Sequence, residues 1–175
     1  MIGKLRNLVW ASALTCISLT ALNAQSLNYP ASQIEFSPES TGAGETVLAI
    51  TKSETQTVES KWNTFTVRVP GQLIFNQSYV LSGEVLVDSM EKPNHLGLTI
   101  LFNNGKMLYA KAPLSTGKSN KFSIPLSKFV TADNAKNKDA VTEQDRISGI
   151  RVYASYSNPS ESNLTLESLE LTNGQ

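Results

Sequence analysis

Cysteine and histidine are nearly absent from this chain of 175 residues, which contains one of each. Cys16 lies in an apolar N-terminal run that we expect to be removed, so the mature chain would lack disulfides, a thiol nucleophile and thiolate metal ligands. A Ser-His-Asp triad would have to include His95, and no Gly-x-Ser-x-Gly elbow accompanies it. The sequence also lacks paired histidines at metal-binding spacing and a phosphate-binding glycine loop. We therefore expect His95 to be a surface or edge histidine and the protein not to be an enzyme.

Charge of either sign is also scarce and balanced. Fifteen lysines and arginines face fifteen acids, and only 17% of the residues are charged. Binding to nucleic acid phosphates needs a basic excess, so this balance argues against nucleic acid as the main partner. The 40% of apolar residues is typical of a globular domain.

The N-terminus has the pattern of a secretory signal peptide. Lys4 and Arg6 precede the mostly apolar stretch Leu8–Leu22, and small residues follow around Ala24. The stretch is short for a membrane span, and an uncleaved anchor is the alternative. We predict a signal peptide over residues 1–24 and a single domain over 25–175, secreted or periplasmic in a bacterium. Cleavage would leave thirteen bases against fifteen acids, a net charge of −2. We expect no stable membrane insertion of the mature chain.

The rest of the chain consists of short apolar runs separated by Ser, Thr, Asn, Gly and Pro. This spacing predicts an all-β fold, an antiparallel β-sandwich or barrel. The predicted strands are Gln33–Phe36, Thr46–Thr51, Trp62–Val69, Ser78–Val87, His95–Phe102, Lys106–Ala112, Lys121–Pro125, Ile147–Tyr156 and Leu164–Leu171. Residues 37–45 and 131–145 are predicted loops, the second with room for one helical turn.

Alternation along these strands predicts which side chains face the core. The apolar rows are expected to point inward; they are Phe65, Val67 and Val69; Tyr79, Leu81, Val85 and Val87; Leu96, Leu98, Ile100 and Phe102; and Ile150, Val152 and Ala154. Asn104-Gly105 fits a two-residue type I′ turn, which pairs Phe102 with Met107 and puts Met107 and Tyr109 on the core face.

The outward rows gather candidate ligand-binding residues. They contain Trp62 and Tyr153 together with Arg68, Glu84 and Arg151. Aromatic rings stack on the C–H faces of sugars, and charged groups hydrogen-bond to their hydroxyls. The alternative for Trp62 is burial in the core under a loop, because Trp is highly buried on average.

Acidic residues suggest two further kinds of site. Three acids, Glu35, Glu45 and Glu170, offer hard oxygen ligands for a structural calcium ion if the first and last strands are neighbours. We expect the protein to require no other cofactor. The alternative is that they only keep the rim soluble. Paired carboxylates such as Glu84 with Asp88 would be needed for glycoside hydrolysis.

Several segments resemble a known family. Five segments are similar to degenerate motifs of jelly-roll carbohydrate-binding modules with a galactose-binding-like fold. They are Trp62–Val69, Phe75–Gly83, Lys121–Phe129, Ile147–Tyr153 and Leu164–Leu171. The resemblance spans roughly residues 30–172 and implies a jelly-roll sandwich that binds a polysaccharide or glycan. The chain departs from the family at Asn76-Gln77-Ser78, where Gly often precedes the Tyr, and at Glu167-Ser168, where Asp is frequent. The second departure weakens the calcium expectation.

These observations favour a secreted, non-catalytic glycan-binding module. Two alternatives stay open: a structural or protein-interaction domain of the cell envelope, which would have a flat polar face and a buried Trp62, and a small glycan-active hydrolase or lyase. The direction of the Trp62 side chain is the observation that separates the first two.

Overall fold

The computed structural model describes residues 26–89 and 93–174. The predicted signal peptide, with Cys16, lies outside the described residues. The elements in chain order are β1 (Ser26–Asn28), η1 (Ala31–Gln33), β2 (Ile34–Phe36), β3 (Thr46–Ile50), β4 (Glu54–Ile74), β5 (Val80–Ser89), β6 (His95–Phe102), β7 (Met107–Ala112), β8 (Ser119–Pro125), η2 (Leu126–Lys128), β9 (Val130–Thr131) and β10 (Arg146–Thr172). Within the described residues the helical segments are three residues long, and none is long and apolar enough to span a membrane.

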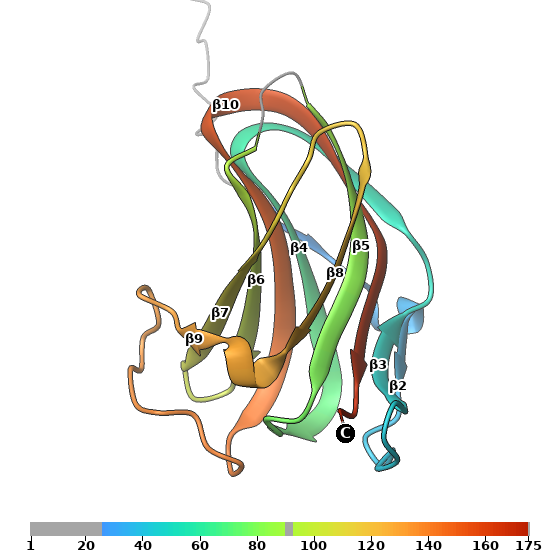
Figure 1. Cartoon of the computed structure of the whole chain (residues 1–175), viewed down its shortest axis with the longest axis vertical. Helices are drawn as coiled ribbons and strands as arrows, with labels where there is room; N and C mark the ends of the chain where they lie inside the picture. The colour runs from blue at the N-terminus through green and yellow to red at the C-terminus, as the bar shows by residue number, and fades with distance from the viewer. Residues whose placement is uncertain (1–25, 90–92, 175) are drawn as a thin grey trace, which may run out of the picture.

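Two long antiparallel strands, β4 and β10, build the frame of a β-sandwich. They pair along almost their whole length, and the ribbon they form bends so that each half belongs to a different layer (Figure 1). The first layer has the order β1-β4-β10-β6-β7-β9. In the second layer the C-terminal half of β10 pairs with β3 and β5, which pair in turn with β2 and β8. The predicted antiparallel jelly-roll sandwich is confirmed, although β1 joins β4 in parallel.

The core lies between the two layers and consists of the predicted apolar rows. All the residues of the four predicted apolar rows are buried, with Phe65, Val67, Leu98 and Val152 among those that are fully inaccessible to solvent. Phe75 and Phe102 meet edge to face at the end of the core, with 5.7 Å between ring centroids. Because alternate side chains on a strand face opposite sides, burial of these rows turns the intervening residues to the outer faces.

The register predicted for the Asn104-Gly105 hairpin is wrong by one residue. The backbone N–H of Phe102 donates to Lys106 O at 3.2 Å, the N–H of Gly105 donates to Phe102 O at 3.2 Å, and Leu101 lies opposite Met107. The loop therefore has three residues. Gly105 alone takes a positive φ, of 80°, whereas a type I′ turn would need one at Asn104 as well. A one-residue slip moves every side chain of β7 to the other face, so Leu108 is buried and Tyr109 points outward.

The polar segment between β9 and β10 is a loop, as its composition predicts, and it does not contain the helical turn for which it has room. Its end is fixed by Asp145, which accepts hydrogen bonds from Lys106 Nζ at 3.0 Å and from Thr142 N at 2.7 Å. Asn104 Nδ2 also donates to Asp145, at 2.6 Å, and Lys106 Nζ donates to Ala140 O at 2.7 Å. The Lys106–Asp145 ion pair is almost buried, and it joins the loop to the β6–β7 hairpin.

Candidate functional site

The candidate site is an open cavity of about 660 Å³ on the outer face of the first layer. Four neighbouring strands, β4, β10, β6 and β7, form its floor, and the loop after β9 forms part of its wall. The lining residues are Ser26, Trp62, Thr64, His95, Thr99, Met107, Tyr109, Lys111, Ala132, Asp133, Asn134, Arg151 and Tyr153.

Three aromatic side chains cross the floor of the cavity on a diagonal. Trp62 on β4 lies 5.5 Å from Tyr153 on β10, and Tyr153 lies 6.5 Å from Tyr109 on β7, measured between ring centroids. The two tyrosine rings are nearly parallel, with 17° between their planes, while Trp62 is tilted by 58°. Trp62 is 43% exposed, so its indole faces solvent rather than the core. The three rings form a continuous apolar surface, the aromatic row.

A glycine on the intervening strand makes the aromatic row possible. Gly97 on β6 lies directly opposite Tyr153 in the register, and β6 separates β10 from β7. A Cβ atom at position 97 would overlap the ring of Tyr153, so this ring covers the bare backbone of the glycine. The tyrosine fills the place that a side chain would occupy, an arrangement known to compensate for glycine in a sheet. Gly97 thus lets Tyr153 reach across β6 toward Tyr109.

Polar groups surround the aromatic row. Arg151 lies two residues before Tyr153 on β10, and Lys111 lies two residues after Tyr109 on β7. Thr99 and Asp133 add a hydroxyl and a carboxylate to the lining. The cavity therefore offers apolar stacking surfaces and hydrogen-bonding groups side by side.

Burial changes the acid–base properties of two rings in the cavity. The pKa of Tyr109 is raised, first by burial and then by hydrogen bonding and charge interaction with Tyr153, so its phenol stays protonated. The pKa of His95 is lowered, mainly by burial and also by the nearby Lys111 cation. The His95 ring contacts Tyr153 edge to face, with 6.0 Å between the ring centroids. The Nδ1 atom of His95 lies 3.4 Å from Ser155 Oγ.

We expect His95 to be neutral at pH 7 and to titrate below the ordinary histidine value of about 6.5. Because the unfolded chain would bind this proton more readily, stability should fall as the pH drops from about 6.5 through the lower pKa of the folded state. The chain has one histidine, so NMR of its imidazole protons reads the titration directly. Lys111→Gln should move the midpoint upward; a wild-type midpoint at or above 6.5 would contradict the assignment.

The structure brings together three of the five residues predicted to bind ligand. Trp62, Arg151 and Tyr153 line the cavity, whereas Arg68 and Glu84 do not. Arg68 is exposed on β4, six residues beyond Trp62 and opposite Gly149. Met107 and Tyr109 also line the cavity, although the two-residue turn expected from the sequence had placed both on the core face.

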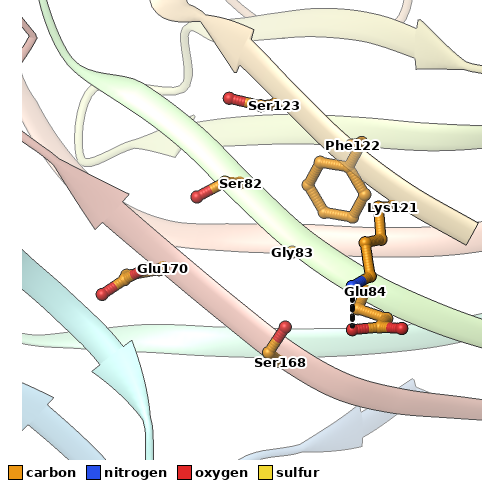
Figure 2. A pocket seen from close by; sticks show the side chains of 8 residues that line it. All are labelled: Ser82, Gly83, Glu84, Lys121, Phe122, Ser123, Ser168 and Glu170. Atoms are coloured by element: carbon orange, nitrogen blue, oxygen red, sulfur yellow. Dashed lines mark ion pairs between the residues drawn. The ribbon is translucent and has the colours of Figure 1, made fainter.

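Glu84 belongs to a different, shallower hollow on the outer face of the second layer (Figure 2). It pairs with Lys121 at 3.7 Å and accepts a hydrogen bond from Ser119 Oγ. The ring of Phe122 lies beside Gly83, where a Cβ would meet it at 2.7 Å. This hollow does not join Glu84 to the aromatic row.

The three acids considered for calcium do not converge. Glu45 accepts a hydrogen bond from the backbone N–H of Gly42 at 2.8 Å, and Glu170 accepts one from Thr46 Oγ1 at 2.6 Å. Glu35 is exposed on β2. Over residues 26–89 and 93–174, no three His, Cys, Asp or Glu side chains are grouped so that they could hold a metal ion. A bound calcium ion thus stays an untested expectation.

No protein family model and no curated protein sequence matches this chain. Among solved structures, it is similar to two family 11 carbohydrate-binding modules from Clostridium thermocellum. One, in complex with a β-1,3-1,4-mixed-linked tetrasaccharide, has a TM-score of 0.48 and 16% identity, and the match covers 72% of this chain and 84% of that one. The other, from the cellulosomal cellulase Lic26A-Cel5E, has a TM-score of 0.46 and 14% identity, with 73% and 84% covered.

A third similar structure is the agarase AgWH50C, with a TM-score of 0.45 and 12% identity. The match covers 87% of this chain and 25% of the agarase.

Proposed function

We propose that this chain is a secreted, non-catalytic module that binds a polysaccharide or glycan along the aromatic row. The observation that supports it best is the contact between Trp62, Tyr153 and Tyr109 on the floor of an open cavity. Sugar rings present apolar C–H faces that stack on aromatic side chains, and their hydroxyls need donors and acceptors nearby. Arg151, Lys111 and Asp133 supply these at the edges of the row.

The exposed Trp62 favours this proposal over an envelope domain without a ligand cleft. The interaction-domain alternative calls for a flat outer face and a buried Trp62, and here the indole lines a cavity and is 43% exposed. A hydrolase would need two convergent acids. Asp133 is the one acid among the described lining residues, so a binding role fits the cavity better than glycoside hydrolysis.

Removal of Trp62 is the direct test. We expect the mature chain to bind at least one soluble glycan of a neutral and acidic panel in affinity electrophoresis, and Trp62→Ala to weaken that binding by about tenfold or more, which corresponds to about 1.4 kcal/mol. The loss is expected because aromatic residues contribute most of the energy in such contacts. Calorimetry with the retained glycan would give the affinity.

Ile74→Ala is the matched control, because Ile74 is another large exposed apolar residue of β4, is 48% exposed, and lies outside the cavity. Its affinity should stay within about twofold of the wild type. Failure to bind any glycan of the panel, or equal affinities of Trp62→Ala and Ile74→Ala, would contradict the proposal.

A further inference from the structure

Two cationic side chains line the cavity without an ionic partner among the described residues. Arg151 and Lys111 both line it, and within residues 26–89 and 93–174 neither forms an ion pair with an acid. The ion pairs that the described residues do form involve Lys52, Lys106 and Lys121, which lie outside the cavity lining. Asp133 is the one carboxylate in the described lining, so the cavity carries a local positive excess.

The Nε atom of Arg151 is buried and has no hydrogen-bond partner among the described residues. Leaving a buried donor unsatisfied is costly, and more so on a charged group. Most buried side-chain polar atoms in folded proteins have a partner, so this guanidinium keeps hydrogen-bonding capacity that the described residues do not use, on a residue that lines the open cavity. The guanidinium is suited to a carboxylate or sulfate, which it binds with paired hydrogen bonds.

The two cations alternate with the two tyrosines on the floor of the cavity. Tyr153 shares a cross-strand row with Gly97 and Lys111, while Arg151 shares the adjacent row with Thr99 and Tyr109. The tyrosines thus occupy one diagonal of a four-residue square and the cations occupy the other. The strands that carry them are two sheet spacings apart, roughly 10 Å. A sugar ring stacked on Tyr153 or Tyr109 would have a cation next to its edge.

We infer that the aromatic cavity selects acidic glycans, with Arg151 and Lys111 binding a carboxylate or sulfate carried by a sugar that stacks on the tyrosines. This inference rests on the proposed function, since it names the ligand class of the same cavity. The negative charge of the mature chain as a whole makes a positive cavity a local feature and not a general property of its surface.

The test compares polymers that differ in charge alone. Two matched pairs are titrated into the mature chain by calorimetry: polygalacturonate with its carboxyl-reduced form, and a sulfated galactan with its desulfated form. We expect an acidic polymer to bind at least about tenfold more tightly than its neutral counterpart. Raising the salt concentration should weaken binding of the acidic polymers selectively. Which acidic polymer binds more tightly distinguishes the carboxylate from the sulfate.

Arg151→Gln and Lys111→Gln should each remove most of this preference while leaving the weaker binding of the neutral polymer in place. Arg146→Gln is the matched control, because Arg146 lies on the same strand and outside the cavity lining. Equal affinity for acidic and neutral polymers, or a preference that survives Arg151→Gln, would overturn the inference and leave glycan binding standing. Absence of binding to all four polymers would overturn both.

Discussion

Gly97→Ala is expected to lower the affinity for glycan by about tenfold or more while the protein stays folded. The added methyl group would overlap the ring of Tyr153, which covers the glycine. This ring is the far end of a flexible side chain, so it can swing away without moving the backbone. The expected result is therefore a broken aromatic row on an intact sheet, measured as an affinity from calorimetry and a free energy of unfolding from urea denaturation.

The stability of Gly97→Ala should differ from that of the wild type by no more than about 1 kcal/mol. Alanine is favoured over glycine in a strand by roughly 0.5–1 kcal/mol, which offsets part of the cost of displacing the ring. The double variant Gly97→Ala, Tyr153→Ala should bind no worse than Tyr153→Ala alone, because both changes remove the same ring from the row. Additive losses in this cycle would show that Gly97 acts in some other way.

Gly83→Ala provides the matched control on the second layer. A Cβ at position 83 would approach the backbone oxygen of Ser168 to 2.6 Å, and a backbone oxygen cannot turn aside. We expect this variant to lose stability and to keep the glycan affinity of the wild type. The two glycine variants should thus show opposite patterns; loss of affinity in both would mean that general unfolding is being measured.

Asp145→Ala is expected to destabilise the fold by about 3 kcal/mol, the second large effect. The substitution leaves the Lys106 ammonium almost buried without its carboxylate partner and frees the backbone N–H of Thr142. It also releases the loop that contributes Asp133 and Asn134 to the cavity, so glycan affinity should fall together with stability. Urea denaturation and calorimetry on one preparation would measure both.

The double variant Lys106→Met, Asp145→Leu is the appropriate control. It removes both charges together, and a buried ion pair replaced by apolar residues is often neutral in stability. We expect it to recover most of the stability lost in Asp145→Ala. If the double variant is as unstable as the single one, the hydrogen bonds to Asn104 and Thr142 matter more than the unpaired charge.

Low pH should weaken the ion pair between Lys106 and Asp145. Burial raises the pKa of Asp145, but hydrogen bonds from Thr142, Lys106 and Asn104 outweigh it, and the net pKa is lower than usual. The contribution of this carboxylate to stability is therefore complete above the ordinary aspartate value of about 3.9 and is lost as the pH falls through the lower value. In Asp145→Asn this part of the acid transition should be missing.

The hairpin at Asn104-Gly105 shows where reasoning from the sequence failed. The Asn-Gly pair marks a turn, and a turn is present. The choice between a two-residue and a three-residue loop depends on how the strands pair beyond it. Phe102 packs against Phe75 in the core, and Asn104 and Lys106 both bind Asp145 from the distant loop. These contacts hold the three-residue loop, and with it Tyr109 on the outer face.

Glu84 illustrates a second limit. Alternation correctly turned this residue outward, as it did Trp62 and Tyr153. A sandwich has two outer faces, however, and the alternation along one strand does not say which layer the strand joins. Since β5 pairs with the C-terminal half of β10, Glu84 lies on the layer opposite the aromatic row.

The residue pattern by itself determined that this chain builds a core from alternating apolar rows, because burial of those rows outweighs other arrangements, and it determined which strand residues face outward. Only the tertiary structure decided which outward residues meet. The bent β4–β10 ribbon assigned them to layers, and the register across β6 placed a glycine beneath Tyr153 and brought Tyr109 beside it. Pairing between strands distant in the chain depends on the whole set of core contacts, which no local pattern contains.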